Sequence, residues 1–590
     1  MTVPNPVSTD HRNLPPHTRR WLPLALVGLV AFGLASACGP SEEELAERMA
    51  SVRAEMAVTL QGENLPQAAR SELEGSRTWT ALQERYAGAA PATVWVAGEG
   101  PRERADELIA TLGGGDENGE GEEGDETADA PDDATGEADD YGASQLAELR
   151  DRARLAVEEE SADMGRHLAN LELAASYAFL TRAFHAIEGR VDPRRLSVGW
   201  YMEGRKAQPL ELLNRVQEGA APAEVLADLD PKHEDYHRLE EARDRYRVIV
   251  ADGGWPRIPA DGETLEEGAE GPRVAALRER LVLEGDLEAQ GDTGEQAAVL
   301  DAEVTEAVRR FQERHGLEVD GVAGGGTLDA LNVPAEDRLR TIELNLERWR
   351  WLPDDLGERY VEVNLPGFTL EAVDGERVAA EMKVVVGKDG WGTPVLTETM
   401  EHVVVNPYWN IPQSILEEDI LPKLEENPSY LAEQNMEVVR PGSDEPLNVG
   451  AAELASGKYR VRQKPGPGNA LGRIKFIFPN HHNVYLHDTP ADYAFDRTYR
   501  DLSHGCVRVQ HPIDLANFVF AGDSRWDGPR IERLIQSREH RTIPLEREIP
   551  VYFLYWTAFV DDGGEVQFRP DLYGYDEKHT QALEGRDRTS

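Results

Sequence analysis

The stretch SHGCVRV at residues 503–509 and the stretch YLHDTP at residues 485–490 decide how this chain is interpreted. His487 is predicted to end a strand, and Cys506 follows a glycine in a turn. These are the residue types of a Cys/His nucleophilic pair, in which the imidazole takes the proton of the thiol. Gly505 would let the backbone approach a substrate closely, so the N–H groups of Gly505 and Cys506 would face an oxyanion.

The spacing of these residues alone leaves two other interpretations open, a structural cysteine and a zinc site. A cysteine before Val-Arg-Val is also compatible with a core residue at the start of a strand. A zinc site would need closely spaced ligands, and one thiol with a single adjacent histidine pair supplies them poorly. We therefore predict no metal, although five histidines accompany Cys506, namely His481, His482, His487, His504 and His511.

The balance of acidic and basic residues excludes some classes of function. The 590 residues include 62 basic and 110 acidic side chains, a net charge of −48, and only nine of the basic residues are Lys. Nucleic-acid binding needs clustered positive charge, so this composition argues against it as the function. Residues 116–140 carry 13 acids and no base; we interpret this tract as a solvated linker rather than a calcium site. Because the rest of the chain is also acidic, adaptation to salt stays an open alternative.

The N-terminus predicts export. Arg12, Arg19 and Arg20 precede an uncharged run over 21–37, which ends in small residues before Cys38. The run resembles the lipobox of bacterial lipoproteins, with its Leu one place further from the Cys. It implies a signal peptide over 1–37 and a lipid on Cys38; Gly39 favours the outer membrane. An uncleaved anchor and simple cleavage are the alternatives, and the run falls short of the ~20 residues that span a bilayer.

The chain divides by pattern into several parts. Residues 41–110 and 144–265 have helical periodicity, and a Gly/Asp/Glu insertion at 111–143 separates them. Residues 271–333 contain amphipathic helices with glycine turns. Alternating and β-branched runs begin at Arg359 and predict a β-rich domain over 359–545, with a helical insert over 411–460. We expect a final hairpin within 546–576, so the fold class is multidomain α+β.

The motifs resemble those of a known family. His487, a gap of fifteen residues and then SHGC match the signature of the L,D-transpeptidases with a YkuD-type catalytic domain. Stretches such as NPYWNIP at 406–412 are similar to the large YcbB-like branch. Residues 271–333 resemble a peptidoglycan-binding domain, a small three-helix bundle. The resemblance implies a helical scaffold domain, this wall-binding unit and a catalytic domain whose insert caps the cleft.

The resemblance also implies residue roles. Cys506 would be the nucleophile and His487 its base, with the Asp488 carbonyl orienting the imidazole. Ser503, His504 and Gly505 would shape the turn and the oxyanion hole. The implied substrate-binding residues are Arg508, which would hold a carboxylate, and Asp488, Tyr485 and Trp409. Arg508 pairing with an acid and Trp409 lying in a core are the alternatives.

The implied function is a periplasmic L,D-transpeptidase that acts without a cofactor. It would join third-position diamino acids of two peptidoglycan stems through a Cys506 acyl-enzyme, and carbapenems would acylate the same thiol. Its partners would be peptidoglycan and, through the lipid, the outer membrane of a Gram-negative bacterium. The alternatives are an L,D-carboxypeptidase, an enzyme that tethers proteins to the wall, and a non-catalytic wall-binding lipoprotein.

Overall fold

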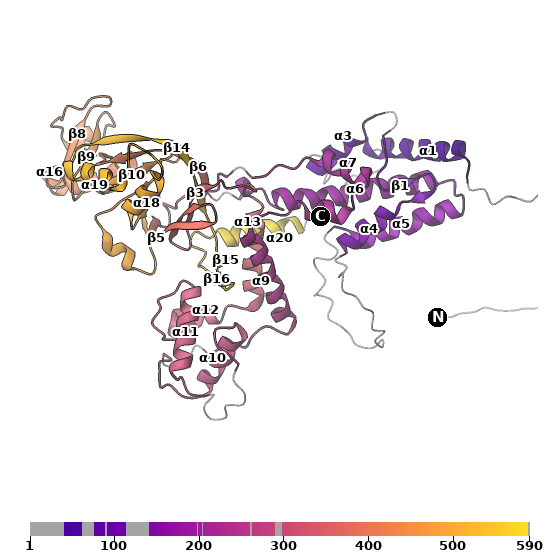
Figure 1. Ribbon diagram of the computed structural model, residues 1–590, viewed down its shortest axis with the longest axis horizontal. Coiled ribbons are helices and arrows are strands. Elements are labelled where there is room, and N and C mark those ends of the chain that lie inside the picture. The colour runs from indigo at the N-terminus through magenta and orange to yellow at the C-terminus, as the bar shows by residue number, and fades with distance from the viewer. Residues whose placement is uncertain are drawn as a thin grey trace, which may run out of the picture.

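A computed structural model shows three bodies, which Figure 1 separates clearly. Scaffold helices and a β-rich body lie at opposite ends, and a small helical unit branches off beside the β-rich body. The structure describes residues 40–61, 76–88, 91–113, 141–196, 199–202, 204–259, 262, 264–289 and 298–587. The signal peptide, Cys38 and most of the acidic insertion lie outside these residues. No helix of the described part is long and apolar enough to span a bilayer.

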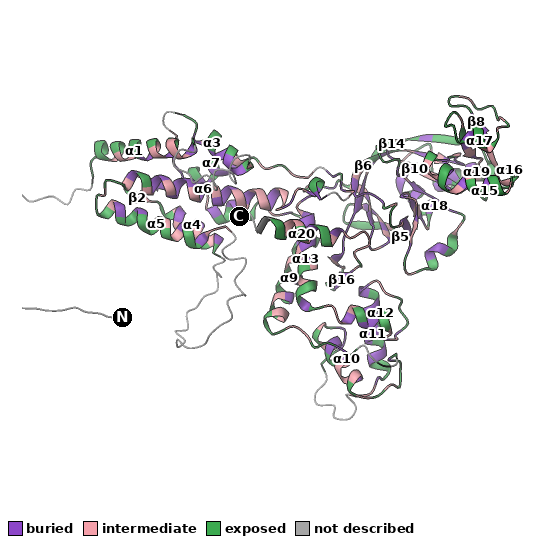
Figure 2. Cartoon of the chain, turned by 180° about the vertical axis from the view of Figure 1, so that it is seen from behind, coloured by how far each residue is buried: buried purple, intermediate pink, exposed green. Residues whose placement is uncertain are grey.

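The scaffold is built around α6 (Met164–Glu188), which is buried along most of its length (Figure 2). Its Glu172 is buried and accepts hydrogen bonds from the backbone N–H groups of Val94, Trp95 and Val96, at 2.6, 2.8 and 3.1 Å. This carboxylate therefore fixes the short ribbon beside the helix. The other elements are α1 (Glu42–Leu60), α3 (Arg77–Arg85), β1 (Val96–Ala97), β2 (Gly100–Pro101), α4 (Glu103–Leu112), α5 (Ala143–Glu158), η1 (Pro193–Arg195), α7 (Pro209–Glu218) and α8 (Pro222–Ala227).

The small unit contains α10 (Pro272–Leu283), α11 (Ala302–Arg314) and α12 (Gly325–Leu331). Asp301 caps α11 by accepting a hydrogen bond from the Val304 N–H at 3.0 Å. Buried Gln312 fixes the following turn, because its amide donates to Asp320 and accepts from the Gly321 N–H, both at 2.8 Å. His315 is stacked on Phe568 of the β-rich body, with ring centroids 5.5 Å apart, so the unit is docked and not merely tethered.

The β-rich body is a sheet that closes on itself. Its strand order is β12-β5-β13-β11-β10-β6-β14-β3-β4, and β4 also pairs with β5. Alternate side chains of the strands fill the interior. The strands are β3 (Arg359–Asn364), β4 (Thr369–Asp374), β5 (Arg377–Gly387), β6 (Leu396–Val405), β10 (Ile474–Ile477), β11 (Leu486–His487), β12 (Asp501–Ser503), β13 (Val507–Val509) and β14 (Arg541–Leu554), with η4 (Asp492–Asp496), α18 (Pro512–Val519) and α19 (Gly528–Ser537) beside them.

The insert between β6 and β10 has its own small core and is not purely helical. Besides its helices it carries a three-stranded sheet in the order β7-β9-β8. These strands were not predicted from the sequence, because each is only two to four residues long and lies among charged residues. The elements are β7 (Trp409–Asn410), α14 (Gln413–Ile415), the π-helical turn η3 (Leu416–Ile420), α15 (Leu421–Glu426), α16 (Tyr430–Glu433), β8 (Met436–Val439), α17 (Ala451–Leu454) and β9 (Arg460–Gln463).

Two expected boundaries shift. The limit placed between residues 545 and 546 falls inside β14, which pairs with both β6 and β3. A register shift between Pro544 and Ile549 interrupts the pairing of β14 with β6 within this polar stretch. The C-terminal hairpin is therefore only β15 (Ala558–Val560) with β16 (Val566–Phe568), followed by α20 (Tyr575–Asp587). In addition, α9 (Glu234–Ala251), expected in the scaffold, packs in one core with α13 (Ala335–Trp349) and the closed sheet.

Candidate active site

Three neighbouring strands place the predicted residues on one face of the sheet. In the register, Lys475 of β10 pairs with His487 of β11, and His487 pairs with Arg508 of β13. The adjacent row, Phe476, Leu486 and Val507, is fully buried in the core. Because side chains alternate along a strand, the first row faces away from that core. Cys506 and Tyr485 precede Arg508 and His487 by two residues and share their face; the Val507 N–H binds the Tyr485 carbonyl at 3.1 Å.

His487 is buried and held in one orientation. Its Nδ1 lies 2.5 Å from the backbone oxygen of Asp488. A carbonyl only accepts hydrogen bonds, so Nδ1 carries the proton and Nε2 keeps a free lone pair. Burial, and next the charge of Arg508, lower the pKa of His487 to about 3. The imidazole is therefore neutral at physiological pH and ready to accept a proton.

Cys506 is half-buried, and its Sγ lies 3.8 Å from the carbonyl oxygen of Asn483. Burial raises the pKa of the Cys506 thiol. Hydrogen bonding to Tyr485 and the charges of Lys475 and Arg508 oppose this increase. Together with the neutral His487, the resting pair is a thiol and an imidazole rather than a thiolate–imidazolium ion pair.

The catalytic turn is tied to its surroundings by hydrogen bonds. The Ser503 hydroxyl accepts from the Gly505 N–H at 3.1 Å and donates to the Cys506 carbonyl at 2.6 Å. Gly505 has φ +104°, a conformation that favours glycine. The Gly505 N–H is thus engaged within the turn, whereas none of the described residues accepts a hydrogen bond from the Cys506 N–H. Of the two expected oxyanion donors, the Cys506 N–H is the one that this geometry leaves for a substrate.

A residue that the sequence analysis missed supports this turn. Thr393, which is fully buried, donates to the Gly505 carbonyl and accepts from the Gly387 N–H, both at 2.9 Å. The Tyr573 hydroxyl accepts from the Thr393 N–H at 3.3 Å and donates to the Gly387 carbonyl at 2.7 Å. No local motif marks Thr393, because its partners lie 6 and 112 residues away in sequence.

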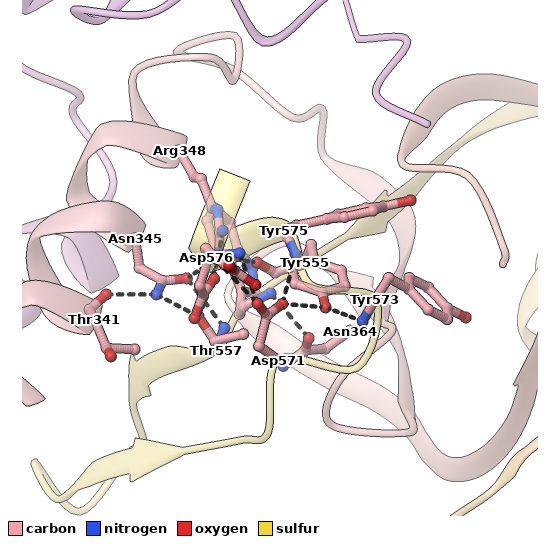
Figure 3. Close-up of polar contacts among 12 residues, drawn as sticks. Thr341, Asn345, Arg348, Asn364, Tyr555, Thr557, Asp571, Tyr573, Tyr575 and Asp576 are labelled. Atoms are coloured by element: carbon pink, nitrogen blue, oxygen red, sulfur yellow. Dashed lines mark hydrogen bonds and ion pairs between the residues drawn. The ribbon is translucent and has the colours of Figure 1, made fainter. Parts of the chain in front are cut away.

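Tyr573 itself belongs to a polar network shown in Figure 3. Its N–H donates to the Tyr555 hydroxyl, which in turn donates to Asp571, both at 2.7 Å. Arg348 of α13 binds the Tyr555 carbonyl at 3.0 Å and Asp576 at 2.5 Å. The C-terminal segment is thereby fixed against α13 and against the loop that holds the catalytic turn.

Asp488 supports the site through its backbone and its side chain. One carboxylate oxygen accepts from the Arg473 backbone N–H and the Arg473 guanidinium, both at 2.7 Å, and the other accepts from the Thr489 N–H at 2.8 Å. A Cβ at Gly472, which has φ +60°, would lie 2.5 Å from the Asp488 Cβ. These contacts engage the Asp488 carboxylate within the fold, and the role of Asp488 in substrate binding stays a prediction.

The remaining predicted residues lie around the same face. His504 is half-buried, with its Nε2 4.0 Å from Asp419 Oδ2 and its ring 5.2 Å from that of Trp391. Asp419 belongs to η3, so the insert approaches the catalytic turn. Burial lowers the pKa of His504. Trp409 packs against the core of the insert, which agrees with the core alternative for its side chain.

Arg508 and Tyr485 complete the face. Arg508 is half-buried, and the described residues give it no carboxylate or hydrogen-bond partner. The Tyr485 ring lies 5.7 Å from that of His487, and the Lys475 ammonium lies 3.4 Å from the Tyr485 centroid. Lys475 was also missed by the sequence analysis. The alternation of apolar and polar positions along residues 474–477 could have revealed it, because this alternation places Lys475 on the face of the sheet opposite to Phe476.

Comparison with known proteins assigns the three bodies. Residues 358–528 match the model of the YkuD L,D-transpeptidase catalytic domain. The chain carries an L,D-transpeptidase catalytic domain. Residues 80–242 match the scaffold domain and residues 270–331 a peptidoglycan-binding domain. The catalytic, scaffold and peptidoglycan-binding domains expected from the sequence are each matched, and the expected multidomain α+β fold class is confirmed.

The chain is also similar to individual proteins. A curated Haemophilus influenzae protein named as an L,D-transpeptidase is 34% identical over 238 residues, which are 40% of this chain and 48% of that protein. The chain therefore matches about half the length of this relative. Two solved L,D-transpeptidases are more distant. One from Xylanimonas cellulosilytica is 19% identical, with 50% of this chain and all of that chain covered, TM-score 0.15. One from Mycobacterium smegmatis is 12% identical, with 33% and 58% covered, TM-score 0.17.

Proposed function

We propose that the protein is an L,D-transpeptidase of the cell wall with Cys506 as its nucleophile. The observation that carries this proposal is the neutral His487, oriented through Nδ1, on the same sheet face as Cys506. The L,D-transpeptidase catalytic domain and the docked peptidoglycan-binding unit support the substrate class. The substrate is a peptidoglycan stem peptide, and the reaction needs no group beyond these side chains.

The first half-reaction acylates the enzyme. His487 Nε2 takes the Cys506 proton as the sulfur attacks the carbonyl carbon of the third-position diamino acid. The oxyanion accepts a hydrogen bond from the Cys506 N–H. As the tetrahedral intermediate collapses, the C–N bond breaks and the leaving amine of D-Ala takes the proton from His487. A thioester on Cys506 and free D-Ala result.

The second half-reaction transfers the acyl group. The side-chain amine of a diamino acid on another stem attacks the thioester and gives a proton to His487. The C–S bond breaks, the thiolate recovers this proton, and a cross-link between two third-position residues forms. Arg508 holds a substrate carboxylate, since a half-buried guanidinium without an acidic partner suits a bidentate anion.

Incubation of the purified full chain with disaccharide-tetrapeptide tests this proposal. Dimeric muropeptide from the native chain and none from Cys506→Ala is the expected result. Tripeptide alone would instead indicate transfer to water, the L,D-carboxypeptidase alternative. Absence of turnover in folded protein, at low and at high salt, would leave a wall-binding protein.

The proposed location is the periplasm, with a lipid on Cys38 that anchors the protein in the outer membrane. The peptidoglycan-binding and catalytic domains support an extracytoplasmic site of action. Mass spectrometry of the N-terminal peptide from membrane fractions tests the anchor. A diacylglyceryl-modified Cys38 is expected, and release of Cys38→Ser into the soluble fraction is the matching control.

A further inference from the structure

The site contains a second cation besides Arg508. Lys475 shares the row of His487 and Arg508, on the other side of His487. With neighbouring strands about 4.8 Å apart, the backbones of Lys475 and Arg508 are separated by roughly 10 Å. The two positive side chains therefore flank the histidine on the face that carries the thiol.

Nothing in the fold neutralises Lys475. Its side chain is half-buried, and among the described residues the ammonium has no carboxylate and no hydrogen-bond acceptor. Its recorded contact is the Tyr485 ring, whose centroid lies 3.4 Å from Nζ. A cation over an aromatic face is stabilised, but all three N–H donors stay available. Nζ is not among the fully enclosed atoms that lack a partner, so it is not completely enclosed by the described residues.

The lack of an acidic neighbour is notable in this chain. There are 110 acidic residues against nine lysines. Two other lysines do have acidic or carbonyl partners: Lys464 lies 3.1 Å from Glu437, and Lys383 lies 3.4 Å from the Phe495 carbonyl. Burial lowers the pKa of Lys475 to about 8, and Cys506 is the charge that opposes this shift. A partly desolvated ammonium without a counter-charge suits an anionic ligand.

We propose that Lys475 binds a carboxylate of the donor stem peptide, distinct from the carboxylate that Arg508 binds. This inference rests on the proposed function and specifies its substrate: a donor with two free carboxylates near the scissile bond. Two groups of such a donor fit this chemistry, the side-chain carboxylate of the diamino acid and the C-terminal carboxylate of the leaving residue. Amidation of the recognised group would then lower affinity, so Lys475 selects non-amidated stems.

Binding in a Cys506→Ser background tests the proposal separately from turnover. Dissociation constants are measured for three tetrapeptides: one with both carboxylates free, one with a side-chain carboxamide and one with a C-terminal carboxamide. Lys475→Met is expected to weaken binding of the free peptide about 10- to 100-fold, the range of a charge-assisted hydrogen bond. For one of the two carboxamide peptides, Lys475→Met should cause no further loss of affinity relative to the parent chain. The carboxylate that this peptide lacks is then the one that Lys475 binds.

Three comparisons sharpen the test. Lys475→Arg should retain most of the affinity because it keeps the charge, and Lys458→Met, at an exposed position, should change nothing. Arg508→Met should weaken binding of the free peptide but should not further weaken binding of the other carboxamide peptide. Equal weakening of all three peptides by Lys475→Met, or no weakening, would overturn the proposal. The proposed function fails on a different result, namely absence of turnover by the native chain.

Discussion

The Thr393 hydroxyl donates a hydrogen bond to the Gly505 carbonyl at 2.9 Å and so links the loop after β5 to the residue that precedes the nucleophile. The same hydroxyl accepts from the Gly387 N–H. One side chain thus holds the turn that presents Cys506, and it depends in turn on Tyr573 near the C-terminus. The geometry of the nucleophile is set by residues far from its motif.

Thr393→Val should therefore impair catalysis. It leaves a buried carbonyl and a buried N–H without partners, and we expect kcat to fall about 10- to 100-fold as the turn shifts. Thr393→Ser should keep most activity. Thr397→Val is the matched control, because the buried Thr397 hydroxyl has no partner to lose. Full activity of Thr393→Val would show that the catalytic turn keeps its conformation without the hydrogen bonds of Thr393.

Gly472→Ala should disturb His487 indirectly. The new Cβ would collide with the Asp488 side chain and require φ +60° of a non-glycine residue. We expect at least about a tenfold loss of activity, because the Asp488 carbonyl orients the imidazole. Gly468→Ala, with open space around its Cβ position, should be active. Similar activity of the two variants would contradict the proposed positioning of His487.

The protonation state of the resting site can be measured by alkylation. Since burial raises the thiol pKa and lowers that of His487, the iodoacetamide rate should be low at neutral pH and rise on the alkaline side. A rate that is already at its plateau at pH 6 would instead reveal a thiolate–imidazolium pair.

A half-buried acidic pair should make stability depend on pH. Glu362 of β3 and Glu371 of β4 are direct cross-strand neighbours. Burial, and next the charge of Glu371, raises the pKa of Glu362 to about 8. Burial, and next the charge of Glu381, raises the pKa of Glu371 to about 7. The folded state then holds more protons than the unfolded state between these values and about 4.5, so stability falls as pH rises through this range.

Glu362→Gln should remove part of this dependence. At pH 8 we expect the free energy of unfolding of Glu362→Gln to exceed that of the native chain by roughly 1–2 kcal/mol, and its melting temperature to be higher. At pH 4.5 the two chains should differ little. Glu401→Gln, at an exposed position of β6, is the control. A difference that is the same at both pH values would contradict the assignment.

Much of the site could be predicted because its chemistry is local in sequence. The strands around His487 and Cys506 alternate in hydropathy, and SHGC compresses the turn into four residues. Lys475 and Thr393 could not be found in this way, since their roles depend on strand register and on long-range hydrogen bonds. The contacts of the Asp488 carboxylate could not be predicted either, because only the fold shows that Arg473 and the Thr489 N–H donate hydrogen bonds to it.

The domain order could also be predicted, but boundaries were less secure. β14 was divided in the prediction because its polar middle coincides with a register shift that only pairing with β6 reveals. The strands of the insert escaped notice because two to four residues are too short for a period to show. The amphipathic helices expected within residues 271–333 are present, and α11 is one of them.

The account depends most directly on Cys506 as the acylated nucleophile. Intact-mass spectrometry after exposure to meropenem tests it, with the native chain beside Cys506→Ala and both checked for folding. We predict one covalent adduct on the native chain, none on Cys506→Ala, and a strongly reduced rate for His487→Ala. An adduct on Cys506→Ala, or no adduct on the folded native chain at low and at high salt, would contradict the account.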